Sequence, residues 1–195
     1  MNKTANDCYV IAGKVIAAQM MGEPIDTLTI DNENPLGFNL TFKVPKTINW
    51  DLDSNDEVAR LANKRFLLIK TALFCGATKG FEFYQLDLNA EKIRAELAAN
   101  EAELRECYNN YCEWADEKRV NGADLYNYFA RIFQNEFKAV KVRNALHTLT
   151  AYLSYDAEEK VTGAELRILL NRQICFQYFE MFTPPIYPEW SCCFE

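Results

Sequence analysis

Residues 87–117 read DLNAEKIRAELAANEAELRECYNNYCEWADE, and their apolar positions predict one long helix. These positions recur at alternating spacings of three and four residues once Asn100 is included, as in a helical hairpin or coiled coil that packs along a narrow seam. Asn100 would either set the register of that packing or weaken it modestly. The seam consists of Ile93, Leu97, Asn100, Leu104, Cys107, Tyr111 and Trp114.

The same stretch carries much of the acidic character of the chain. It holds nine acidic and three basic side chains, whereas the whole protein of 195 residues has a formal net charge of −7. Winding the helix at about 100° per residue places five glutamates in one narrow sector beside the seam. They are Glu96, Glu103, Glu106, Glu113 and Glu117. Because the seam fixes the orientation of the helix, we expect this sector to form an acidic surface that binds a basic partner.

Composition restricts the class of protein. Apolar residues make up 49% of the chain, enough for the core of one domain or of two small ones. The N-terminus does not resemble a secretory signal or a membrane span, because Asp7 precedes its apolar stretch and Lys14 interrupts it. We therefore expect a soluble, cytoplasmic protein without a membrane partner.

The seven cysteines predict neither a disulfide framework nor a metal site. Their number is odd and no export signal is expected, so we predict reduced thiols that act as small apolar groups. Cys107 and Cys112 are five residues apart, and Cys192 and Cys193 are adjacent, so neither pair has the usual spacing of a zinc site. We expect no cofactor.

Three capping boxes, in which a hydroxyl precedes a carboxylate by three residues, predict the starts of helices. They are Thr4–Asp7, Ser54–Glu57 and Thr162–Glu165. The first helix is expected over residues 5–21, ending at Gly22, and the second over residues 55–75, ending at Gly76. The predicted core face of the second helix consists of Val58, Ala62, Phe66, Ile69 and Leu73.

Between these two helices the pattern changes to period two. Residues 38–44 place four apolar side chains on one side of a strand, and Pro45 ends it. Residues 25–30 are the expected partner strand, and residues 81–86 are a third candidate. A small antiparallel sheet with one face covered by helices follows from this pattern.

These elements predict an α+β protein that is predominantly α-helical, with a small antiparallel sheet in the N-terminal half packed on helices and a helical C-terminal half. Three regions are expected: an α+β region at 1–88, a helical region with the long acidic helix at 89–182, and an extended tail at 183–195. Pro184 and Pro185 prevent a helix from continuing into the tail. Tyr187 and Trp190 in this tail either fold back onto the body or bind a partner, and we include them in the candidate binding site.

Two segments of the second half are open to alternative interpretations. Two segments resemble each other, RVNGADL at 119–125 and KVTGAEL at 160–166. The similarity indicates either a duplicated helical hairpin or independent use of the same helix-capping sequence. Residues 154–165 resemble the calcium-binding loop of EF-hand proteins, with Ser154, Asp156, Glu158 and Glu165 at ligand positions. The EF-hand family has glycine where this chain has Glu159, so we expect an ordinary helix–loop–helix and no calcium.

No residue pattern predicts catalysis. His147, the single histidine, lies between leucines on a helical stretch, where a histidine is usually a surface or structural group. Neither a glycine-rich phosphate loop nor an HExxH motif is present, so we expect a protein that is not an enzyme. A basic patch at Lys138, Lys141, Arg143 and His147 favours nucleic-acid binding, whereas the pI of about 4.9 argues against direct contact with nucleic acid.

The leading hypothesis is a non-enzymatic intracellular protein whose acidic helix face engages a basic protein surface. Small acidic proteins that phages and mobile elements encode to block host nucleases or defence complexes act as nucleic-acid mimics, and the chain is compatible with this anti-defence class of inhibitor in size and charge. One alternative is a structural subunit of a larger complex, whose partners bury its aromatic faces. Another is an enzyme of unrecognised type.

Overall fold

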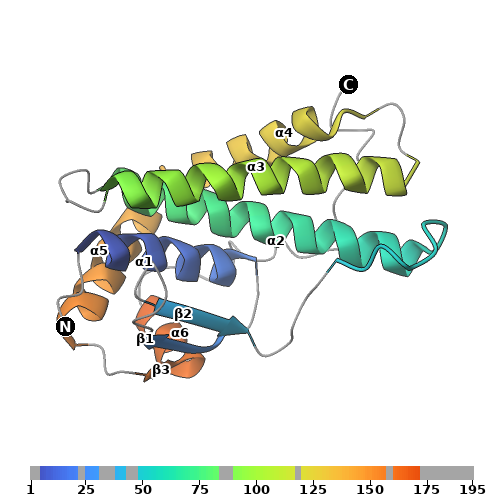
Figure 1. Ribbon diagram of the computed structural model, residues 1–195. Helices are drawn as coiled ribbons and strands as arrows, with labels where there is room; N and C mark the ends of the chain where they lie inside the picture. Colours follow the sequence, from blue (N-terminus) through green and yellow to red (C-terminus); the bar gives the residue numbers. More distant parts are fainter. Residues whose placement is uncertain are drawn as a thin grey trace.

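The computed structural model describes residues 5–21, 25–30, 38–42, 48–83, 90–116, 120–156 and 160–171. The elements, in order, are α1 (Ala5–Met20), β1 (Ile25–Ile30), β2 (Phe38–Phe42), α2 (Glu57–Glu82), α3 (Ala90–Trp114), α4 (Gly122–Glu136), α5 (Val140–Ala151), a π-helical turn (Tyr152–Asp156), β3 (Lys160–Thr162) and α6 (Gly163–Asn171) (Figure 1). The predicted fold class, a predominantly helical α+β protein with a small antiparallel sheet, is confirmed.

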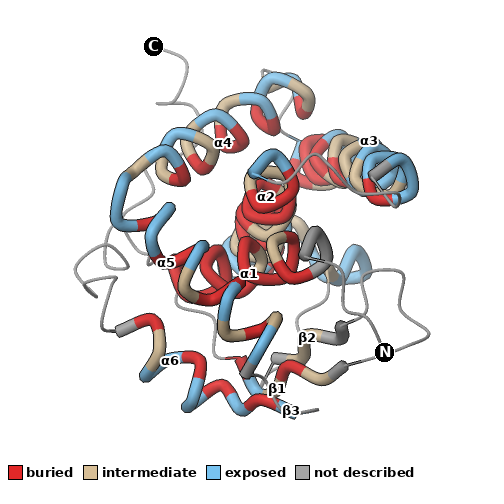
Figure 2. Tube along the Cα trace, turned by 90° about the vertical axis from the view of Figure 1, so that its left-hand side faces the viewer, coloured by how far each residue is buried: buried red, intermediate tan, exposed pale blue. Residues whose placement is uncertain are grey.

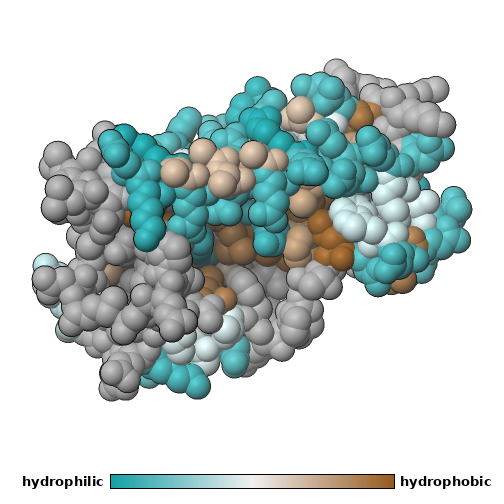
Figure 3. All heavy atoms as spheres, in the orientation of Figure 1, coloured by the Kyte–Doolittle hydropathy of each residue, from teal (hydrophilic) through white to brown (hydrophobic). Residues whose placement is uncertain are grey.

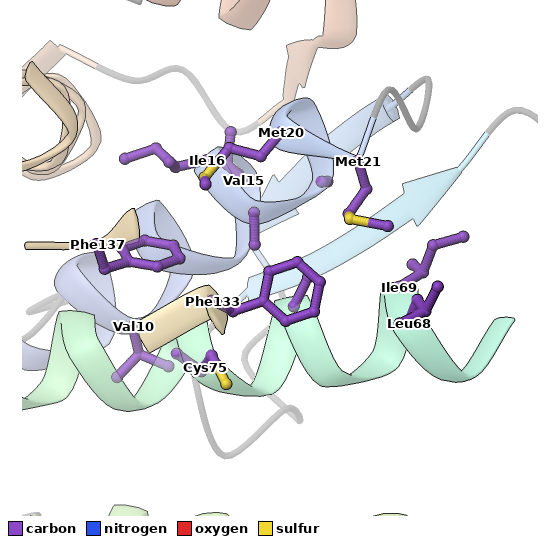
Figure 4. Close-up of a cluster of buried hydrophobic side chains, with 14 of the residues drawn as sticks. Val10, Val15, Ile16, Met20, Met21, Leu68, Ile69, Cys75, Phe133 and Phe137 are labelled. Carbon is purple, nitrogen blue, oxygen red and sulfur yellow. The ribbon is translucent and has the colours of Figure 1, made fainter. Parts of the chain in front are cut away.

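The longest of the described helices, α2, lies at the centre of the fold. α3 and α4 contact it on one side and α1 on the other, with α5 beside α1 (Figure 2). The sheet and α6 lie beyond α1 (Figure 1). One hydrophobic core connects these layers, and Figure 4 shows Phe133 of α4 near Val10 of α1 and Cys75 of α2.

α1 and α2 cross so closely that their backbones are in contact. A Cβ atom on Gly13 would overlap the carbonyl oxygen of Gly76, and a Cβ atom on Gly76 would overlap that of Gly13. One turn further along α2, a Cβ atom on Gly80 would overlap the carbonyl oxygen of Tyr9. Only glycine permits this approach, so the three glycines set the distance between the two helices.

The crossing explains why the predicted end of α2 at Gly76 is wrong. α2 continues through Gly76 to Glu82, because this glycine accommodates α1 and does not stop the helix. The predicted core face is also wrong in part, since Val58 is 73% exposed although Ile69 is buried. A central helix contacts neighbours on several sides, so one apolar stripe does not identify its buried face.

α3 follows the predicted seam along most of its length. Ile93, Leu104 and Tyr111 are buried, Leu97, Cys107 and Trp114 are partly buried, and Asn100 is exposed. Tyr108 lies outside the predicted seam but is fully buried, and its hydroxyl shares a hydrogen bond of 2.8 Å with that of Thr71 on α2. This buried pair joins α3 to the central helix.

The sheet has the strand order β2-β1-β3. β1 and β2 are antiparallel, as predicted, with Leu28 opposite Leu40. The predicted third strand at 81–86 is wrong at its start, because residues 81 and 82 form the last turn of α2, and residues 84–86 lie outside the described residues. The third strand is β3, which pairs with the other edge of β1 and places Val161 opposite Leu28. The C-terminal half therefore contributes to the sheet as well.

The helix starts confirm one capping box and correct another. The Thr162 amide donates to the Glu165 carboxylate at 2.7 Å, and the Glu165 amide donates to the Thr162 hydroxyl at 3.3 Å. The Ser54–Glu57 box is wrong, because Asp56 caps α2 and its carboxylate accepts from the Val58 amide at 2.9 Å. The Thr4–Asp7 box lies outside the residues whose side chains are described.

The glycine contact predicts that replacing Gly76 by alanine lowers the free energy of unfolding, which is the reverse of the usual effect of this change in a helix. Gly→Ala inside a helix normally stabilises a protein by about 0.5–1 kcal/mol. We expect Gly76→Ala to lower the free energy of unfolding by about 1–3 kcal/mol, because the new Cβ atom meets the backbone of α1. Urea denaturation of the purified protein measures this change.

Asn100→Ala on the exposed side of α3 is the control and is expected to change stability by less than about 0.5 kcal/mol. A Gly76→Ala variant as stable as the original protein would show that the two helices are not held at backbone contact.

Candidate functional site

The surface over α3 in Figure 3 is mainly hydrophilic, and most of the predicted acidic sector belongs to this helix. Glu103, Glu106 and Glu113 are all exposed. None of the three makes an ion pair or a hydrogen bond within the described part of the chain. We call these three residues the acidic face. Three other predicted binding residues lie outside the described residues; they are Glu117, Tyr187 and Trp190.

Glu96 differs from the other glutamates of the sector. It is partly buried, and its carboxylate is close enough to the Lys14 ammonium of α1 for a Coulombic interaction. Burial lowers the pKa of Lys14, while Glu96 raises it and Lys70 of α2 lowers it. Glu96 therefore offsets part of the cost of a partly buried lysine, and we separate it from the acidic face.

The opposite flank of α3 is neutralised by the protein itself. Arg105 forms an ion pair of 2.8 Å with Glu101 and donates to the side chain of Asn127 on α4 at 3.0 Å. Its guanidinium also lies over the Tyr126 ring, 4.2 Å from the centroid. The two flanks differ because Arg105 forms an ion pair on the side that meets α4, whereas no ion pair with the acidic face occurs within the described part of the chain. Lys70 of α2 is near enough to act electrostatically on Cys107, as Glu103 and Glu106 do.

Glu113 lies where an acidic side chain is electrostatically unfavourable. It belongs to the last turn of α3, which contains no basic residue, and the C-terminal end of a helix carries the negative end of its dipole. Asp116 lies two residues beyond the end of α3 and has a positive φ of 53°. Helix stability would favour lysine or arginine at this end, so helix stability does not account for the negative charge.

A loop of residues 48–56 lies against this end of α3. The amide of Asn49 donates to the side chain of Asn63 on α2 at 3.2 Å, and the Asn63 amide group donates back to the Asn49 carbonyl at 3.2 Å. The Trp114 indole of α3 donates to the Leu52 carbonyl at 3.2 Å. Three hydrogen bonds therefore hold the loop against both helices.

The loop and the first residue of α2 add four carboxylates to the same end of the molecule. They belong to Asp51, Asp53, Asp56 and Glu57. Asp56 caps α2, and Asp53 accepts from the Asn55 amide at 2.9 Å, so both also have a structural role. Neither residues 48–58 nor residues 106–116 contain a lysine or arginine. We did not predict this part of the site, although the run DLDSNDE beside Trp50 was a visible signal.

The remaining candidate groups of the described residues are engaged by the fold or lie at its surface. Burial raises the pKa of the Cys75 thiol to about 12, and its sulfur donates to the Ala130 carbonyl. His147 shares a hydrogen bond of 3.1 Å with the Tyr9 hydroxyl and borders a depression of about 460 Å³ that Lys141 also lines. No cluster of metal-binding side chains occurs among the described residues. In residues 154–165, the Glu165 carboxylate is engaged by Thr162.

Comparison with known protein families, curated proteins and solved structures finds no match. None of the helices in the described ranges combines the length and apolarity needed to cross a membrane. The geometry of the acidic end is therefore what guides a functional conclusion.

Reversing the charge at the end of α3 should increase stability. We expect Glu113→Lys to raise the free energy of unfolding by about 0.3–1 kcal/mol at low ionic strength, because a cation interacts favourably with the C-terminal end of the helix dipole. Urea denaturation at low and high salt measures the gain, which should shrink as salt screens the charges.

Glu91→Lys in the first turn of the same helix is the matched control and should change stability in the opposite direction. If both variants were destabilised equally, Glu113 would be stabilising the fold, contrary to our interpretation.

Replacing Lys14 should have a pH-dependent effect. The unfolded chain binds the Lys14 proton up to about its ordinary pKa of 10.5, whereas the folded chain releases it at lower pH. The penalty for burying the charge is therefore complete below the folded pKa and is lost as the pH rises toward 10.5. We expect Lys14→Met to be more stable than the original protein at neutral pH, with the difference narrowing at alkaline pH.

Thermal unfolding across this pH range, with Lys141→Met on the exposed side of α5 as the control, measures the difference. A stability gap for Lys14→Met that stayed constant or widened with pH would contradict the prediction.

Proposed function

We propose that the protein is a non-enzymatic binding protein whose acidic face on α3 engages a basic surface of a partner protein. The observation that carries this proposal is the exposure of Glu103, Glu106 and Glu113 without an ion pair in the described part of the chain. A basic partner would supply the missing countercharge and would steer association over several ångströms.

The electrostatics of α3 give the proposal a second line of support. Glu113 opposes the helix dipole, and the neighbouring loop carries three more acidic residues and no basic one. Charge that lowers stability is often kept for function, because binding sites are selected for affinity as well as for stability. A partner of opposite charge relieves the repulsion on binding.

We further propose that the partner is a nucleic-acid-binding protein and that the chain acts as an inhibitor of the anti-defence type. At about 1.5 Å rise per residue, successive glutamates of the acidic face lie roughly 5 to 11 Å apart along α3, a range that brackets successive phosphates of a nucleic-acid strand. An acidic helix of this kind can occupy a groove built for phosphates. Cytoplasmic location is the corresponding expectation for such an inhibitor.

A structural subunit is the second candidate function, and one observation favours it. Val58 and Leu61, on the first turns of α2, are 73% and 52% exposed. Apolar side chains at this spacing form a short stripe that a permanent partner could cover. An association through this stripe would persist at high salt, whereas an association through the acidic face would weaken.

Charge reversal tests the proposed function. We expect a variant with Glu103, Glu106 and Glu113 all changed to Lys to bind a fluorescent lysine–glycine peptide about tenfold or more weakly than the original protein, because each exposed charge contributes up to about 1 kcal/mol. Fluorescence anisotropy over a salt series measures the affinity, and circular dichroism verifies the fold.

The control is a triple variant with Asp26, Glu91 and Asp124 changed to Lys, which alters the net charge equally at exposed positions elsewhere. Equal loss of binding in the two triple variants would show that the peptide responds only to net charge, and the proposed acidic face would then be rejected.

A further inference from the structure

Two indole rings form an exposed ledge where the loop of residues 48–56 meets the end of α3. The centroids of the Trp50 and Trp114 rings lie 6.0 Å apart, with 64° between the ring planes. Trp50 is 37% exposed and the adjacent Leu52 43% exposed, while Trp114 is partly buried. Pale and hydrophobic surface is visible at this end of the molecule, at the right of Figure 3.

The ledge is held in place by contacts that do not depend on a ligand. The Trp114 indole donates to the Leu52 carbonyl, and its ring also packs against Tyr111, with centroids 5.8 Å apart. The buried Asn63 holds the start of the loop through Asn49. Because these bonds fix the loop, the exposure of Trp50 belongs to the folded state and is available to a partner without rearrangement.

Three aromatic rings elsewhere in the described part of the protein lie under its own cations. Arg105 lies 4.2 Å from the centroid of the Tyr126 ring, Lys70 lies 5.5 Å from that of Phe66, and Arg94 lies 5.8 Å from that of Phe81. Within the described ranges, no lysine or arginine lies over Trp50 or Trp114. Tryptophan attracts a cation more strongly than tyrosine or phenylalanine does. The two rings best suited to bind a cation are therefore the ones without a lysine or arginine of the described residues over them.

Each of the two tryptophans has an acidic neighbour in the sequence. Asp51 follows Trp50 in the loop, and Glu113 precedes Trp114 in α3. Both are exposed. A side chain that suits this combination is positively charged and has a flat apolar surface. A nucleic-acid strand is excluded as the occupant, because its phosphates would face carboxylates.

We infer that the ledge of Trp50 and Trp114, together with Asp51 and Glu113, binds the guanidinium group of an arginine in a basic segment of the partner protein. Arginine fits better than lysine because its planar group stacks on an aromatic ring, is less strongly hydrated, and can donate two parallel hydrogen bonds to a carboxylate. This inference rests on the proposed function and adds to it, since it specifies which basic side chain the partner presents.

Two peptides of equal charge test the inference. One repeats arginine and glycine, and the other has lysine at each arginine position. We expect the original protein to bind the arginine peptide several-fold more tightly, and we expect Trp50→Leu to remove that preference while keeping its affinity for the lysine peptide. Tryptophan fluorescence should change on addition of the arginine peptide, and the change should be much smaller in Trp50→Leu.

Tyr155→Leu is the matched control, because Tyr155 is an aromatic residue of the π-helical turn that is 87% exposed. It should keep the arginine preference. Circular dichroism establishes that both variants are folded. Trp50→Phe, which retains a weaker aromatic face, should restore part of the preference.

The outcomes separate this inference from the proposed function. If Trp50→Leu kept the full arginine preference, the ledge would not be an arginine site, whatever the acidic face does. If the triple charge reversal on α3 left the affinities for both peptides unchanged, the proposed function would fail. An arginine preference equal in Trp50→Leu and Tyr155→Leu would likewise overturn the inference.

Discussion

The backbone contact between α1 and α2 is the constraint on which the rest of the fold depends. With Gly13 against Gly76 and Gly80 against Tyr9, the two helices approach more closely than any side chain would allow. α2 then supports α3 and α4 on its other side, while α1 supports α5 and lies next to the sheet. The position of the acidic face relative to the core therefore follows from a contact that contains no side chain on either helix.

Local patterns predicted the elements of this fold, and long-range contacts decided where the predictions were wrong. The seam of α3 and the pairing of β1 with β2 depend on periodicity within a single element, and both were predicted. Gly76 has the same appearance in sequence whether it ends a helix or faces another glycine, and only the approach of α1 distinguishes the two cases. The third strand was misplaced because a short edge strand forms through its pairing with a neighbouring strand, and its own residues carry little sequence pattern.

The candidate site was likewise predicted where it depends on one helix and missed where it depends on tertiary contacts. Periodicity predicted that Glu103, Glu106 and Glu113 share one side of α3, and all three are exposed. It also grouped Glu96 with them, although Glu96 interacts with Lys14, a residue distant in sequence. The pairing of Trp50 with Trp114 joins residues that no local pattern connects, because it requires the loop to be bonded to α2 and α3 at once. Surface charge can be read along one helix, but a site shared by two segments needs their tertiary arrangement.

The pairing of β3 with β1 has a consequence for how the protein is made. Leu28 and Val161 are opposite each other in the sheet, yet roughly 130 residues separate them in the chain. On the ribosome, the hairpin of β1 and β2 emerges long before its third strand, and two strands alone are marginally stable in water. The sheet is therefore completed only after the chain segments of α2, α3 and α4 have emerged. A nascent chain truncated before residue 160 would contain every residue of the acidic face and none of the strand that completes the sheet.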